Sequence, residues 1–250
     1  MLEFRTNALS FSGNRARIGR NFTTIRNPNV RHPDMAITFF NHILDKHIAP
    51  GVSTFTAAAI PDMSEYTKES PHWVANFFLN SAVGAQFKPP MDAYAYNYLR
   101  RAQFAFSEHD LARNKTLEFL ERKNQSVTLY VGALFHWECF LGQSWHAYAS
   151  LAKAWAGTVF QKDDGSVEQR LNTLYNQMKH VESRIENAQM LPNATVPVWL
   201  ENEGLRSVDA NLTYSETADV LKELAKYANA LMDPRTAKSA LSVDASDTRT

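Results

Sequence analysis

The chain has little of what several enzyme classes require. It contains a single cysteine, Cys139, so it forms no internal disulfide bond. It contains nine glycines, and none belongs to a G-x-x-x-x-G-K-[ST], G-x-G-x-x-G or G-x-S-x-G motif. Phosphate-cradling loops, dinucleotide-binding turns and the nucleophile elbow of hydrolases are thus missing. These absences argue against nucleotide hydrolysis and Rossmann-type chemistry, and the sequence predicts no catalytic residue.

The chain also lacks an excess of charge and a long apolar run. Its formal net charge is +0, so no overall field favours nucleic acid or an anionic membrane. The most apolar stretch, residues 129–155, is interrupted by His136, Glu138, Gln143, His146 and Lys153. We therefore predict no membrane span. Because the N-terminus has no apolar secretory segment, the sequence predicts a cytoplasmic protein.

The longest helical signal in the sequence covers residues 111–155, which contain no proline and only the glycines Gly132 and Gly142. Apolar residues fall on one side of a helical projection of this stretch, and polar residues fall on another. The pattern predicts one long central helix with a bend near one of the two glycines. The preceding helix is expected to start at Pro89-Pro90 and to end near Phe106.

Shorter helical signals surround this central helix. Ser70-Pro71 predicts the start of a helix with Trp73, Val74, Phe77, Phe78 and Val83 turned inward, and the pair Thr213 and Glu216 predicts a capping box for a last helix. The sequence thus predicts an all-α chain, an antiparallel bundle of about six helices around the central one. The expected parts are a basic, irregular N-terminal arm at 1–33, one helical domain at 34–233, and a disordered tail at 234–250.

A heptad pattern marks the helix predicted over residues 167–188. Its apolar positions are spaced alternately by four and three residues, as in a coiled coil. They are Val167, Leu171, Leu174, Met178, Val181, Ile185 and Ala188. Because the connecting loop is short, we expect antiparallel pairing with the central helix. The alternative is that this helix binds a protein partner or a second copy of the chain.

Glu138 breaks the apolar pattern of the central helix. A carboxylate among apolar residues is desolvated, which is costly unless a buried cation or hydrogen-bond donor meets it. One interpretation is a structural glutamate with one buried partner. The other is a ligand pocket formed by Glu138 with the nearby aromatic residues Trp137, Trp145 and Tyr148.

The sequence offers no metal or cofactor site. A di-metal bundle needs Glu-x-x-His motifs on inward helix faces, and the only match joins Glu69 to His72 at a helix entrance. His136 and His146 do not have the spacing of a zinc pair. No metal and no cofactor are therefore predicted.

The N-terminal arm is locally basic, which raises the alternative of RNA binding. Its candidate contacts are Arg15, Arg17, Arg20, Arg26 and Arg31. Two long antiparallel helices, the first with a core glutamate, loosely resemble the HEPN group of helical bundles, many of which are ribonucleases. That group carries an Arg-x4-6-His motif in a later helix, whereas the only spacing match here is Arg26 to His32, before the bundle. The sequence favours a non-catalytic bundle that binds a protein or a small ligand, with an RNA-binding or RNA-cleaving HEPN-like bundle as the alternative.

Overall fold

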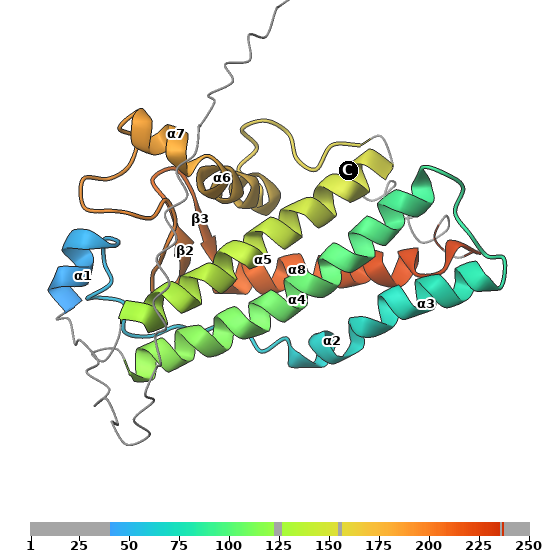
Figure 1. Cartoon of the computed structure of the whole chain (residues 1–250), viewed down its shortest axis with the longest axis horizontal. Helices are drawn as coiled ribbons and strands as arrows, with labels where there is room; N and C mark the ends of the chain where they lie inside the picture. Colours follow the sequence, from blue (N-terminus) through green and yellow to red (C-terminus); the bar gives the residue numbers. More distant parts are fainter. Residues whose placement is uncertain (1–40, 123–126, 155–156, 236, 238–250) are drawn as a thin grey trace, which may run out of the picture. The chain divides into compact units, whose positions relative to one another are not determined.

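The computed structural model describes residues 41–122, 127–154, 157–235 and 237. The described residues are mostly helical, with a small sheet (Figure 1). The N-terminal arm and most of the predicted tail lie outside them, so those two predictions stay predictions. Within the described residues, no helix is both long enough and apolar enough to cross a membrane.

Two long helices, α4 (Met91–Glu121) and α5 (Val127–Ala154), form an antiparallel hairpin. Contacts of Arg101 with Gln143 and of Glu108 with His136 show the direction, because the α5 number falls as the α4 number rises. The prediction of one helix over 111–155 is therefore wrong. Helix α4 continues through Phe106 and ends at Glu121, since Arg122 leaves helical geometry at φ −109° and ψ 24°.

The hairpin packs against several other helices of the chain. Helix α8 (Tyr214–Leu231) contacts α3, α4 and α5, while α2 (Ser64–Glu69) and α3 (Pro71–Ala82) both contact α4. Helix α1 (Asn41–His47) comes first among the described elements. The Thr213–Glu216 capping box is present at the start of α8, as predicted.

Helix α3 starts at Pro71, as the sequence predicted, but buries fewer residues than expected. Trp73 and Phe77 lie in the core. Phe78 and Val83 are exposed, so their predicted inward orientation is wrong. The reason is geometric: Phe78 follows Phe77 by about 100° around the helix, which leaves its ring at the edge of the contact with α4, beside Tyr96 at 5.3 Å.

The heptad segment is divided between two helices, α6 (Val167–Lys179) and α7 (Val181–Glu186). His180 interrupts the helix with φ −116° and ψ 32°. Figure 1 shows α6 nearly end-on while α5 lies in the plane of the view, so α6 crosses α5 at a large angle. The predicted antiparallel pairing of this segment with the central helix is therefore wrong.

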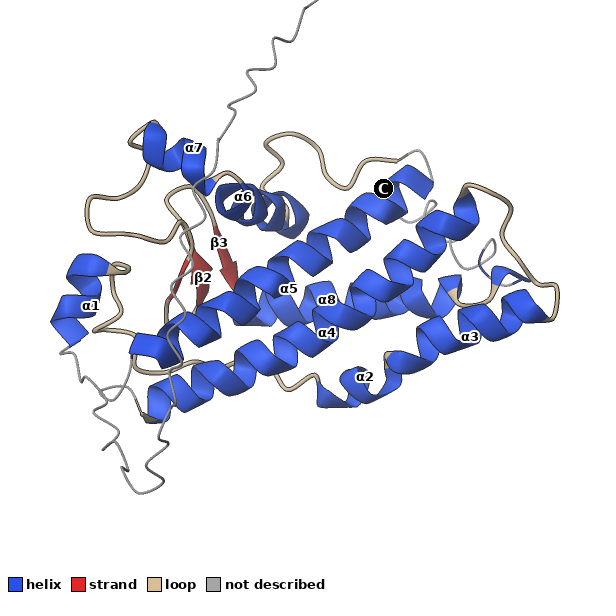
Figure 2. Ribbon diagram, in the orientation of Figure 1, coloured by secondary structure: helices blue, strands red, loops and turns tan. Residues whose placement is uncertain are grey.

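The all-α prediction missed a small sheet between α7 and α8 (Figure 2). Its antiparallel strands follow in the order β1 (Trp199–Leu200), β2 (Gly204–Arg206) and β3 (Asn211–Thr213). Val198, Trp199 and Leu200 are buried. Strands of two or three residues are too short for the alternating pattern by which a strand is recognised in sequence.

Candidate functional site

Polar contacts join the two helices of the hairpin, and the central one is a bridge between Glu108 and His136. Nδ1 of His136 lies 2.8 Å from a carboxylate oxygen of Glu108, and both side chains are partly buried. Arg101 donates a hydrogen bond of 2.8 Å to Oε1 of Gln143 farther along the same pair of helices. These contacts fix the register of α4 on α5 and therefore the positions of the side chains around them.

Large apolar side chains surround this bridge on the outside of the hairpin. Phe104 and Leu111 lie within one turn of Glu108 on α4. Val131 and Phe135 are four residues apart on one side of α5, and the ring of Phe135 contacts that of His136 at 5.4 Å. Their side chains are exposed by 46% (Phe104), 43% (Leu111), 48% (Val131) and 57% (Phe135). We call these four residues the hairpin face. Clustered exposure of large apolar side chains is characteristic of interaction surfaces.

Gly132 lies beside the hairpin face on α5. A Cβ atom built on Gly132 would meet no atom within 4 Å, so nothing in the described part of the chain occupies the space above it. Glycine inside a helix lowers stability by about 0.5–1 kcal/mol relative to alanine. Packing within the described residues therefore gives no reason for glycine here, whereas close approach of another backbone would give one.

Glu138 borders the hairpin face, one turn beyond Phe135. It lies on the side of α5 that α6 covers, because Gly142 and Trp145, at i+4 and i+7, both approach Tyr175 of α6. Burial raises the pKa of the Glu138 carboxyl to about 7. Among the described residues the carboxyl has no hydrogen-bond or ion-pair partner. A structural role that depends on a buried cation is therefore without support in the described chain.

The other predicted pocket residues are divided between two sides of α5. Trp145 shares the side of Glu138, and its ring stacks on that of Tyr175 at 6.4 Å. Trp137 and Tyr148 face the core, where Trp137 Nε1 donates to Thr116 Oγ1 at 3.0 Å and the Tyr148 hydroxyl donates to Glu223. Glu138 and Trp145 thus lie on one side of α5, whereas Trp137 and Tyr148 belong to the core.

Cys139 lies near both glutamates and is not activated as a nucleophile. Burial raises the pKa of its thiol, and the charges of Glu108 and Glu138 raise it further. Since the thiolate is the reactive form, this environment keeps the sulfur protonated and unreactive. Three or more His, Cys, Asp or Glu side chains arranged to hold a metal ion are not found in the described part of the chain.

His109 is a buried polar residue that the sequence analysis missed. It lies in the core beside Trp137 and Phe140, with Nε2 3.3 Å from Thr217 Oγ1. Its Nδ1 has no partner within the described structure. Burial lowers the pKa of the ring to about 4. A signal was available, because His109 stands i+3 from Phe106 and i−3 from Ala112, both core residues.

Comparison of the chain with protein-family models, with curated proteins and with solved structures finds no match. Arg15, Arg17, Arg20, Arg26 and Arg31 lie outside the described residues, as does the spacing match from Arg26 to His32. The RNA-binding alternative therefore stays a prediction.

Proposed function

We propose that this chain is a non-catalytic binding module, and that its hairpin face docks an amphipathic helix of another protein. The exposure of Phe104, Leu111, Val131 and Phe135 around one polar bridge carries the proposal. A helix laid over two antiparallel helices buries such side chains in the manner of helix-in-groove recognition. The open space over Gly132 allows its backbone to come close.

The carboxylate of Glu138 indicates which charge the partner helix carries. Glu138 is partly desolvated at the edge of the face and lacks a partner among the described residues. A lysine or arginine on the flank of the docked helix would supply the missing opposite charge. The ligand of this face is thus an amphipathic helix with a basic flank.

A pair of designed helical peptides tests the proposal on the full chain. Both carry the same leucine stripe, one with lysine and the other with glutamate on its flank. We expect the lysine peptide to bind at least about tenfold more tightly, because pairing with a desolvated carboxylate contributes about 1.5–3 kcal/mol. Glu138→Gln should remove most of this difference when affinity is measured by fluorescence anisotropy.

Three results would contradict the proposal. The first is equal affinity for the two peptides, and the second is no binding of either. The third is a stable dimer of the free protein in sedimentation experiments that Phe135→Asp dissociates, because the occupant of the face would then be a second copy of this chain.

A further inference from the structure

Helix α3 carries a second exposed apolar surface, separate from the hairpin face. Its inward side holds the helix on the bundle: Trp73 Nε1 donates to Asn229 of α8 at 2.8 Å, and the ring of Phe77 lies 6.1 Å from that of Tyr96 on α4. The opposite side has apolar residues at the i, i+3, i+4, i+7 and i+8 positions of an amphipathic helix, and all five are exposed. We call them the α3 stripe, and they are Ala75, Phe78, Leu79, Ala82 and Val83.

The large residues of the α3 stripe are at least as exposed as those of the hairpin face. Leu79 is exposed by 63% and Val83 by 69%, whereas the most exposed residue of the hairpin face, Phe135, reaches 57%. Apolar side chains gathered on one side of a surface helix are characteristic of an interaction surface. The stripe therefore needs a partner of its own.

The helix that carries the stripe has no side chain that would hold a charged partner. Residues Pro71–Ala82 include no aspartate, glutamate, lysine or arginine. Beside the stripe, Asn80 donates to the carbonyl of Met232 at 2.9 Å and accepts from Arg235 at 3.2 Å, so both ends of its amide are used. Arg235 is itself paired with Asp233 at 2.8 Å. Nucleic acids and anionic membranes are disfavoured, because lysine and arginine hold both of them and α3 has neither.

A second copy of the chain suits the charge distribution of α3. In a twofold pair the same surface meets itself, so a charged residue near the axis would face its own like charge. A stripe without charge avoids this repulsion. Antiparallel copies of α3 also place the negative end of one helix dipole beside the positive end of the other. No acidic residue in the first turn and no basic residue in the last turn of α3 already neutralises those ends.

We propose that the α3 stripe packs against the α3 stripe of a second copy, in an antiparallel twofold contact centred on Leu79. Leu79 is the middle residue of the stripe, so it meets Leu79 of the second copy, and Ala75 of each copy lies near Val83 of the other. Phe78, whose ring lies 5.3 Å from that of Tyr96, covers the flank of the contact. This contact is independent of the hairpin face, which lies on α4 and α5.

Sedimentation equilibrium of the full chain tests the contact. We expect the average mass to rise from one chain toward two between about 1 µM and about 300 µM protein, because an interface of one short helix per copy is small and therefore weak. Leu79→Asp should weaken the dimer by about tenfold or more, since it places two carboxylates against each other at the axis. Phe135→Asp, on the hairpin face, should leave the dimer unchanged. Circular dichroism checks that both variants fold.

A charge-swap pair tests the antiparallel geometry. Leu79→Lys should also be monomeric on its own, because two ammonium groups then meet at the axis. An equimolar mixture of Leu79→Asp and Leu79→Lys should form dimers, since opposite charges face each other there.

Four outcomes overturn the proposal. They are a wild-type chain that stays monomeric at every concentration, a dimer that Leu79→Asp leaves intact, a dimer that Phe135→Asp dissociates, and a mixture of the two Leu79 variants that stays monomeric. Leu79→Asp should not change the affinity for the lysine-flanked peptide, so failure at the α3 stripe and failure at the hairpin face are distinguished.

Discussion

Gly204→Ala is expected to destabilise the protein by about 3–5 kcal/mol, among the largest effects of a single methyl group. A Cβ on Gly204 would lie 2.1 Å from the carbonyl oxygen of Leu212 and 2.6 Å from Cα of Thr213. Both are backbone atoms of β3, which pairs with β2 at this position. They cannot move aside as a side chain would, so the two strands must separate.

Gly132→Ala is the matched control for this prediction. The same methyl group meets no atom within 4 Å there, and alanine is the better helix former. We expect stability to rise by about 0.5–1 kcal/mol. Urea unfolding monitored by circular dichroism measures both variants. A Gly204→Ala protein as stable as the wild type would show that β2 and β3 do not pair as described.

The second large effect is on the pH dependence of stability, and it comes from Glu138. Its pKa is about 7 in the folded chain and near 4.5 when unfolded, so the folded state holds its proton more tightly. The contribution of Glu138 to stability is therefore fully present below about pH 4.5 and is lost as the pH rises through 7. The shift corresponds to at most about 3 kcal/mol, which solvent around the partly buried carboxyl reduces to about 2 kcal/mol.

His109 affects the pH dependence of stability in the opposite direction, over an overlapping range of pH. Burial lowers its pKa from 6.5 to about 4, so the folded state releases its proton more readily. Stability from this group is fully present above about pH 6.5 and is lost as the pH falls toward 4. Because the ring is buried, the effect is about 3 kcal/mol. In the wild type the two groups therefore offset each other between about pH 4.5 and 6.5.

Two variants separate these contributions when each is compared with the wild type. The stability of Glu138→Gln relative to the wild type should increase by about 2 kcal/mol from pH 4.5 to 8. The stability of His109→Phe relative to the wild type should decrease by about 3 kcal/mol from pH 4 to 7. The reason is that the wild type becomes more stable over this range as its unfolded state loses the proton from His109. Denaturant unfolding at each pH measures both. Differences that stay flat across the range would contradict the burial of the corresponding group.

Local signals predicted much of the helical structure. Pro71, Pro90 and the Thr213–Glu216 box lie at helix starts, because proline geometry and side-chain capping act within one turn. The end of α4 at Glu121 was missed, since the apolar pattern continues in phase beyond it. The sheet was missed because its register depends on backbone contacts such as that of Gly204 with Leu212, which no periodicity encodes.

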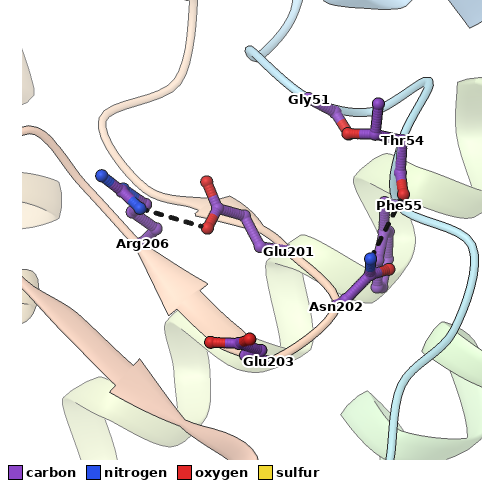
Figure 3. A pocket seen from close by; sticks show the side chains of 7 residues that line it. All are labelled: Gly51, Thr54, Phe55, Glu201, Asn202, Glu203 and Arg206. Atoms are coloured by element: carbon purple, nitrogen blue, oxygen red, sulfur yellow. Dashed lines mark hydrogen bonds and ion pairs between the residues drawn. The ribbon is translucent and has the colours of Figure 1, made fainter.

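The candidate sites also differ in whether the sequence alone could predict them. Glu138 was predicted because a carboxylate among apolar residues is visible in sequence. The pocket between the loop that follows α1 and the turn that joins β1 to β2 (Figure 3) was not predicted, because Asn202 reaches Thr56 across a long stretch of chain that only the fold brings together. The hairpin face was also missed, because the pairing of Glu108 with His136 sets which apolar residues stay outside.

The affinity of the lysine-flanked helical peptide for Phe135→Asp, compared with Phe78→Asp, tests the central claim most directly. Both variants place a charge at a phenylalanine of similar exposure, 57% on the hairpin face and 54% on α3. We expect Phe135→Asp to weaken binding by about tenfold or more, because it removes a central apolar contact. Phe78→Asp should leave the affinity unchanged. Equal affinities for the two variants would show that the hairpin face is not where the helix docks.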